Sequence, residues 1–201
     1  IVIDHESLRH NVKTICDWCE DSGIFVAGVI KGANGILSVA EDYVAGGAKM
    51  IASSRMEQLK RCREGNIGVP LLMIRVPMLS ELDELVQVAD YSLNSEIVTL
   101  RALDKAAEAH GVIHNVVLMA DLGDLREGYF NHDELVETAE IVERELSHLH
   151  LAGIGTNLGC YGSVMATEDK MQELADLAIR VEESIGRELE IVSGGATSSL
   201  M

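Results

Sequence analysis

The sequence predicts an α/β protein with a parallel sheet that closes as an eight-stranded (β/α)8 barrel. Three observations support this fold class. Short apolar runs rich in branched residues alternate strictly with stretches of helical spacing, which implies parallel strands joined by right-handed crossovers. Seven such runs can be recognised, and polar residues stand where the runs end. A barrel gathers these polar residues on one rim, whereas an open sheet spreads them along an edge. We therefore expect a barrel with its eighth strand absent from this chain.

Composition limits the class of protein. The chain has 201 residues, 47% of them hydrophobic, and a formal net charge of −17. This length supports one domain with a sizeable core, and the apolar fraction is too high for a disordered chain. The acidic balance argues against a nucleic-acid partner, because it leaves no basic stripe to neutralise phosphates. No apolar stretch approaches the ~18 residues that cross a membrane.

A helix is expected first, because apolar residues repeat at helical spacing near the start of the chain: Leu8, Val12, Ile15 and Cys19. This stretch also holds Cys16 and Cys19 as a C-x-x-C pair, a pattern found in redox and zinc sites. Since no second pair of ligands is near, we interpret the thiols as small side chains packed on a helix. Four cysteines at this length predict reduced thiols and a cytoplasmic location.

The seven strands and the helices between them follow in order. Strands are expected at 25–30, 50–52, 71–74, 91–93, 116–119, 149–154 and 189–192. Helical spacing is clearest around 82–86, 100–107, 135–146 and 171–181. Two helix starts are predicted by the capping-box pairs Ser38–Glu41 and Ser54–Glu57. Four helix ends are predicted at Gly46, Gly65, Gly111 and Gly186.

Polar residues mark the carboxyl ends of the predicted strands: Lys31, Ser53, Arg75, Asn94, Asp121, Asn157 and Ser193. Active sites of barrels lie on this rim. The first strand is not followed by G-x-G-x-x-G, which weakens the alternative of a dinucleotide-binding open sheet. Arg75 and the nearby Arg55 fit ion pairs on the rim as well as ligand contacts.

Lys31 is the first candidate for chemistry, because it continues the apolar run 26–30. Burying an ammonium is costly, and lysines in such places often react with carbonyl compounds. The alternative is a side chain that simply reaches solvent at the end of the strand.

Arg126 is the second candidate. It stands between two glycines in the loop 121–128, just beyond a strand, where its planar fork could bind a carboxylate or a phenolate. The alternative is a surface turn with an Asp–Arg pair.

The third candidate is the turn 193–199, which follows the last strand and opens a possible helix. Its amides and hydroxyls are those of a phosphate cradle, although Ser/Gly turns are also common without a ligand. The turn contributes Ser193, Gly194, Gly195, Thr197 and Ser198. A lysine, a guanidinium and a phosphate cradle together fit pyridoxal 5'-phosphate.

With these motifs the chain resembles the alanine racemase-like barrel enzymes, the fold type III pyridoxal phosphate enzymes. The resemblance rests on the opening stretch 3–11, on Gly28-Val29-Ile30-Lys31-Gly32 and on D-x-G-x-x-R-x-G at 121–128, and it covers essentially the whole chain. Four stretches are similar to the ornithine racemases in particular: 74–79, 121–129, 153–162 and 193–195.

The resemblance implies a role for each site residue. Lys31 would hold the cofactor and act as one of two bases, and Arg126 would contact the cofactor and the substrate carboxylate. Asn157 stands where alanine racemases have a histidine near the ring, and the turn 193–199 would bind the phosphate. Gly35 departs from the family, since alanine racemases have a phosphate-binding tyrosine four residues after the lysine.

The resemblance also implies an eighth strand and a C-terminal β-domain beyond Met201. We therefore expect residues 1–201 to form the incomplete barrel domain of a longer, homodimeric enzyme that racemises ornithine. The alternatives are a racemase for alanine or lysine, a decarboxylase, and a non-catalytic protein that manages the cofactor supply. The second base is not identified: Cys160 and Tyr161 lie in a suitable loop, but packing or gating would also explain them.

Overall fold

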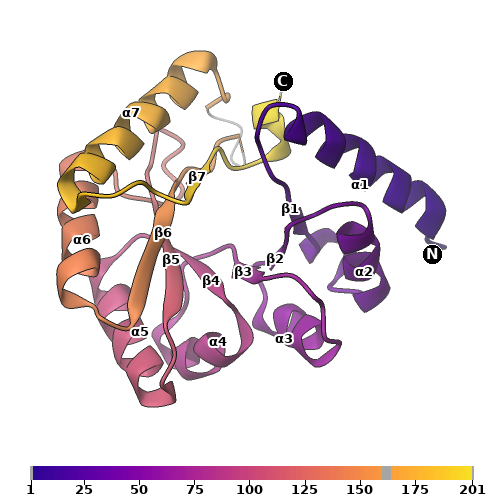
Figure 1. Cartoon of the computed structure of the whole chain (residues 1–201), viewed down its shortest axis with the longest axis horizontal. Helices are drawn as coiled ribbons and strands as arrows, with labels where there is room; N and C mark the ends of the chain where they lie inside the picture. The colour runs from indigo at the N-terminus through magenta and orange to yellow at the C-terminus, as the bar shows by residue number, and fades with distance from the viewer. Residues whose placement is uncertain (1, 160–163, 201) are drawn as a thin grey trace. The chain divides into compact units, whose positions relative to one another are not determined.

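The computed structural model describes residues 2–159 and 164–200. A first helix is followed by seven strands that alternate with helices (Figure 1). The chain divides into two compact units, of which unit 1 comprises Ile1–Arg75 with Gln87–Tyr91, and unit 2 comprises Val76–Val86 with Ser92–Met201. None of the helices in the described ranges is both long enough and apolar enough to span a membrane.

Unit 1 begins with a helix and holds three parallel strands. β1 pairs with β2 and β2 with β3, while α1 packs on α2, and α2 and α3 cover the strands. Its elements are α1 (His5–Glu20), β1 (Ala27–Val29), the 3-10 turn η1 (Lys31–Ala33), α2 (Leu37–Ala45), β2 (Met50–Ser53), α3 (Met56–Glu64) and β3 (Leu71–Met73).

Unit 2 contains three more parallel strands, in which β6 lies between β5 and β7. Helix α6 packs on β5, β6 and α7, and α7 packs on β6 and β7 (Figure 1). Two elements, α4 (Leu82–Val88) and β4 (Tyr91–Asn94), include residues of both units. The others are η2 (Leu79–Glu81), α5 (Ile97–His110), β5 (His114–Met119), α6 (His132–Glu145), β6 (Leu149–Gly155), α7 (Glu168–Ile185), β7 (Ile191–Ser193) and η3 (Thr197–Leu200).

The strand order decides between the two possible closures of the sheet. The seven strands follow one another in chain order, from β1 to β7. An open doubly wound sheet reverses direction at a switch point, whereas a barrel winds in one direction only. The predicted barrel class is therefore confirmed. All seven predicted strands are found, with ends that differ by no more than two residues.

The glycines predicted to end helices do so. Gly111 and Gly186 adopt the left-handed conformation, which a residue without a Cβ atom accepts readily, whereas Gly46 and Gly65 have φ angles of −80° and −78°. The C-caps of α2, α3, α5 and α7 are Gly46, Gly65, Gly111 and Gly186.

The two predicted capping boxes are wrong. Helix α2 begins one residue ahead of Ser38, and Arg55, not Ser54, is the N-cap of α3. Among the described residues neither helix has a capping side chain. At α3 the hydroxyl of Ser53 accepts the Arg55 amide at 3.2 Å, so the turn into the helix is already organised before Ser54.

Strands β5 and β6 are almost fully buried, as their apolar runs require. β6 also approaches β7 unusually closely. A Cβ atom on Gly153 would lie 1.8 Å from the carbonyl oxygen of Ile191, and one on Gly155 would lie 2.9 Å from the Cβ of Ser193. These two glycines let β7, and the turn that follows it, lie directly against β6.

Candidate functional site

Lys31 lies at the carboxyl end of β1 in unit 1, where the chain leaves the strand and turns. Ile30 is fully buried and its amide donates to the carbonyl oxygen of Ala52 at 2.9 Å. Lys31 then opens η1, and its side chain is exposed. Within the described ranges its amine has no hydrogen bond or ion pair, which leaves a primary amine available for a ligand.

Of the other polar residues at this end of unit 1, Ser53 and Arg75 make hydrogen bonds within the unit. The Ser53 hydroxyl is fully buried and donates to Gln58 Oε1 at 2.6 Å. Arg75 Nε donates to the carbonyl oxygen of Ser54 at 2.8 Å. Arg55 is exposed at the start of α3. Lys31 is thus the residue of this group that presents a reactive side chain.

In unit 2 the loop after β5 is held by hydrogen bonds between its own residues. Asp121 Oδ1 accepts the amides of Gly123 at 2.8 Å and Leu125 at 3.1 Å. The Tyr129 amide donates to Met119 O at 2.7 Å. Gly128 has φ +110, and a Cβ atom there would lie 2.6 Å from the Asp121 nitrogen, so this position requires glycine. The carboxylate of Asp121 therefore shapes the loop and does not pair with Arg126.

Arg126 contacts a different acid. Its Nη2 lies 3.5 Å from Glu127 Oε1, and the same oxygen accepts a hydrogen bond from Asn157 Nδ2 at 2.6 Å. The Arg126 side chain is 31% exposed and that of Glu127 only 12%, so the guanidinium is held at Nη2 and stays partly accessible. Sequence reasoning singled out Arg126 and Asn157 but missed Glu127, because its contact with Asn157 joins residues 30 positions apart in the chain.

The turn after β7 packs against this cluster. The Thr156 amide donates to Ser193 O at 3.0 Å. Gly195 has φ +85, and a Cβ atom there would lie 2.4 Å from Thr156 O and 3.2 Å from the Cα of Asn157. Further on, Ser199 Oγ donates to Gly194 O at 2.7 Å, which closes the turn at the start of η3.

The structure thus brings several of the expected site residues together in unit 2. Arg126, Asn157 and the turn that holds Ser193, Gly194, Gly195 and Thr197 form one cluster, with Glu127 as an addition. A guanidinium, two hydroxyls and the backbone amides of a glycine-rich turn can bind an anion such as a phosphate or a carboxylate.

The remaining expectations have three different outcomes. Asn94 is fully buried, and its amide nitrogen donates to the Ser92 oxygen atoms at 3.0 Å, so it belongs to the core. Ser198 lies in η3. Cys160 and Tyr161 fall outside the described residues.

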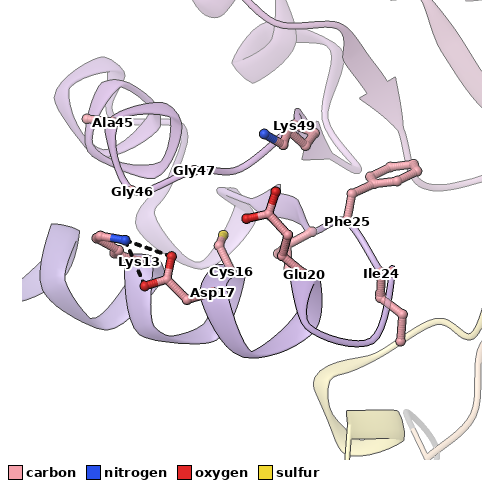
Figure 2. Close-up of a pocket in the computed structure, with 12 residues that line it drawn as sticks. Lys13, Cys16, Asp17, Glu20, Ile24, Phe25, Ala45, Gly46, Gly47 and Lys49 are labelled. Atoms are coloured by element: carbon pink, nitrogen blue, oxygen red, sulfur yellow. Dashed lines mark hydrogen bonds and ion pairs between the residues drawn. The ribbon is translucent and has the colours of Figure 1, made fainter.

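A separate cavity of about 410 Å³ lies in unit 1 at the amino ends of β1 and β2 (Figure 2). Lys31 follows the carboxyl end of β1. Lys13 and Asp17 form an ion pair at 2.7 Å on its wall. The Cys16 thiol packs against Gly47, and burial raises its pKa. Cys19 is buried, and the described residues contain no group of three or more potential metal ligands. Both cysteines of the C-x-x-C pair lie on α1, where Cys19 is buried and Cys16 is partly buried.

The family model for the alanine racemase N-terminal domain matches residues 3–201. The chain is 38% identical over 200 residues to the ornithine racemase of Acetoanaerobium sticklandii, and the match covers 100% of this chain and 56% of that protein. It is 30% identical to the lysine racemase of Thermotoga maritima over 200 residues, which is 100% of this chain and 55% of that protein.

Among solved structures, D-threonine aldolase from Filomicrobium marinum superposes with a TM-score of 0.82 at 20% identity, over 99% of this chain and 56% of that one. This likeness concerns the fold alone. The chain spans about half the length of the curated relatives that it matches. With essentially its whole length matched by the family model, the chain belongs to the family of the alanine racemase N-terminal domain.

Proposed function

We propose that this chain is the cofactor-binding barrel domain of a pyridoxal 5'-phosphate-dependent amino-acid racemase that interconverts L- and D-ornithine. The observation that carries the proposal is the 38% identity to an ornithine racemase along the whole chain. A cytoplasmic homodimer at natural length is part of the same proposal.

The residues present fit this cofactor. The exposed amine of Lys31 suits covalent attachment of an aldehyde. In unit 2 the glycine-rich turn packs so closely on Thr156 and Asn157 that a Cβ atom at Gly195 would clash with them. The backbone amides of such a turn can bind an anion. Ser193, Thr197 and the turn amides would bind the phosphate, and Arg126 supplies a positive charge in the same unit.

The roles in racemisation follow from the side chains. Pyridoxal phosphate, when bound, withdraws electrons from the α-carbon of an amino acid and makes its proton acidic. Lys31 would take or return that proton on one face. Arg126 would hold the substrate carboxylate with its planar fork. Glu127, which accepts a hydrogen bond from Asn157, would hold the guanidinium in place. A second base would act on the opposite face, and Tyr161 or Cys160 are the residues to mutate first.

Two other functions are open to test. Lysine has the same charged side chain as ornithine with one more methylene, and the 30% identity to a lysine racemase favours it as the second substrate. The net charge of −17 suits either cationic amino acid through long-range attraction. A protein that only stores or delivers the cofactor would bind it through Lys31 without turnover.

Trapping the cofactor on its lysine tests the assignment. We expect borohydride reduction of the cofactor-loaded protein, followed by peptide mapping, to place the label on Lys31. Lys49 is an internal reference, because it is exposed at the opposite end of the strands in unit 1. Label on another lysine would overturn the assignment of Lys31.

A panel of L-amino acids then identifies the reaction. Chiral chromatography should show racemisation of ornithine faster than of lysine and alanine, by the protein at its natural length. Trapped cofactor with no racemisation of any amino acid would favour the storage function.

A further inference from the structure

The turn that carries Lys31 is held in an unusual backbone conformation. After η1, two successive residues have positive φ angles, 51° at Asn34 and 64° at Gly35. The left-handed region is unfavourable for residues with a side chain, and asparagine tolerates it better than most. Asparagine and glycine adopt this region at small cost, so contacts with neighbouring residues decide how firmly the turn is held.

Gln58 of α3 is the residue that holds this turn. Its side chain is 1% exposed, and its Nε2 donates to Asn34 Oδ1 at 3.3 Å. A Cβ atom on Gly35 would lie 2.6 Å from the Gln58 Cβ, so Gln58 also fills the space beside the turn. A second donor from α3, Arg61 Nη1, reaches the Asn34 carbonyl at 3.0 Å.

The hydrogen bonds through Gln58 run in one sense from β2 to the turn. The Arg55 amide donates to Ser53 Oγ at 3.2 Å, and the Ser53 hydroxyl donates to Gln58 Oε1 at 2.6 Å. The Gln58 amide then donates to Asn34. The position therefore needs a side chain that accepts at one atom and donates at the other, as a primary amide does.

We propose that Gln58 is the positioning residue of Lys31. It acts through Asn34 and Gly35: by fixing their left-handed turn, it fixes the backbone of η1 from which the Lys31 side chain extends. Its importance for the reaction rests on the proposed function, whereas its hold on the turn does not.

Two variants test the hydrogen bond between Gln58 and Asn34, one at the donor and one at the acceptor. Gln58→Leu keeps the approximate volume and removes both hydrogen bonds, and Asn34→Gly removes the acceptor while accepting the positive φ. Gln172→Leu is the matched control, because Gln172 is exposed on α7 and donates only to its own helix, at Asp176 Oδ1, in the described structure.

The first readout is amide hydrogen exchange without added cofactor. The amides of Asn34 and Gly35 donate to Lys31 O and Ile30 O in the intact turn. We expect their exchange to be roughly tenfold faster in either variant, with β2 protection unchanged, and the double variant to add little to the singles. Unchanged exchange in both single variants would overturn the proposal.

The second readout uses the protein at natural length with pyridoxal phosphate. We expect kcat to fall by about tenfold or more with KM changed much less, because a misplaced reacting group slows the chemical step. The pH midpoint of the cofactor absorbance band should also move, which a general loss of stability would not produce. Faster exchange of the turn with kcat and absorbance unchanged would refute a role in positioning Lys31.

The two readouts separate the two claims. If the wild-type protein neither binds the cofactor nor racemises amino acids, the proposed function has failed. Hydrogen exchange of the turn then still decides whether Gln58 holds it.

Discussion

The Arg126 guanidinium is both planar and positively charged. Its Nη2 lies 3.5 Å from Glu127 Oε1 and the side chain is 31% exposed, so part of the guanidinium is accessible to a planar ligand. We expect Arg126→Lys to retain the cofactor but to lose turnover by about a hundredfold, since an ammonium cannot reproduce the fork. Absorbance of the bound cofactor and chiral chromatography measure the two effects separately. Wild-type racemisation by this variant would show that the loop has only a structural role.

Gly195 is a residue where conformation and space both require glycine. Its φ is +85°, and an added Cβ would lie 2.4 Å from Thr156 O. We expect Gly195→Ala to destabilise unit 2 by about 2–3 kcal/mol, or to weaken phosphate binding sharply if the turn shifts instead. Thermal unfolding and cofactor titration distinguish these results.

Gly186→Ala is the matched control for that substitution. Gly186 has φ +79°, but no atom of the described residues lies within 4 Å of an added Cβ. Only the unfavourable backbone conformation would therefore destabilise the Gly186→Ala variant. A destabilisation of about 1 kcal/mol is expected there. If the two substitutions destabilised the protein equally, contact between Gly195 and Thr156 would not constrain the turn.

At the scale of the elements, Arg187 ties α6 to the connection between α7 and β7. Its Nε and Nη2 donate to the two carboxylate oxygens of Glu143 at 2.9 and 2.7 Å, and Nη2 also donates to Leu151 O at 2.8 Å. Lysine cannot make these bonds together. We expect Arg187→Lys to lower the free energy of unfolding by about 1 kcal/mol, measured from the urea midpoint. An unchanged midpoint would contradict a stabilising role for the paired geometry.

Elements were predictable where the signal is local. Gly111 and Gly186 end their helices with left-handed φ angles, which glycine accepts without a Cβ clash. Strands were predictable because buried parallel strands need continuous apolar runs. The helix starts predicted from Ser38 and Ser54 were wrong. A local capping pair competes with hydrogen bonds made by other residues at the start of a helix, such as the bond from Ser53 to Gln58.

The site was predictable only in part for the same reason. Lys31 and Arg126 follow strands, and their place in the sequence is enough to single them out. Glu127 and Gln58 act through contacts with Asn157 and Asn34, which lie 30 and 24 residues away in the chain. No local spacing encodes such contacts, because the fold creates them.

At the scale of the whole molecule, acid should weaken the fold. The hydrogen bond from Arg187 lowers the pKa of Glu143 below its ordinary 4.5. A carboxylate with a lowered folded pKa stabilises the protein above the unfolded pKa, and this stabilisation is lost as pH falls through the folded pKa. We expect the free energy of unfolding to decline below about pH 4.5, and to decline less steeply in Glu143→Gln.

The control for this pH dependence is Glu137→Gln, which changes an exposed glutamate on the same helix. It should follow the wild-type curve in chemical denaturation across the acid range. If Glu143→Gln and Glu137→Gln gave the same slope, the ion pair with Arg187 would not be the source of the acid sensitivity.

The closeness of β6 to β7 has a consequence for how natural variation in this family is interpreted. The space between Gly153 and the Ile191 carbonyl admits a hydrogen atom and nothing larger, so any other residue at position 153 must push β7 outward. Ser193 ends that strand, and the turn after it would be carried along. A variant at position 153 would then resemble the loss of a ligand-binding residue, although glycine has no side chain with which to touch the ligand. Invariance at this position across relatives would record the spacing of two strands, and should not be taken as a sign of chemistry.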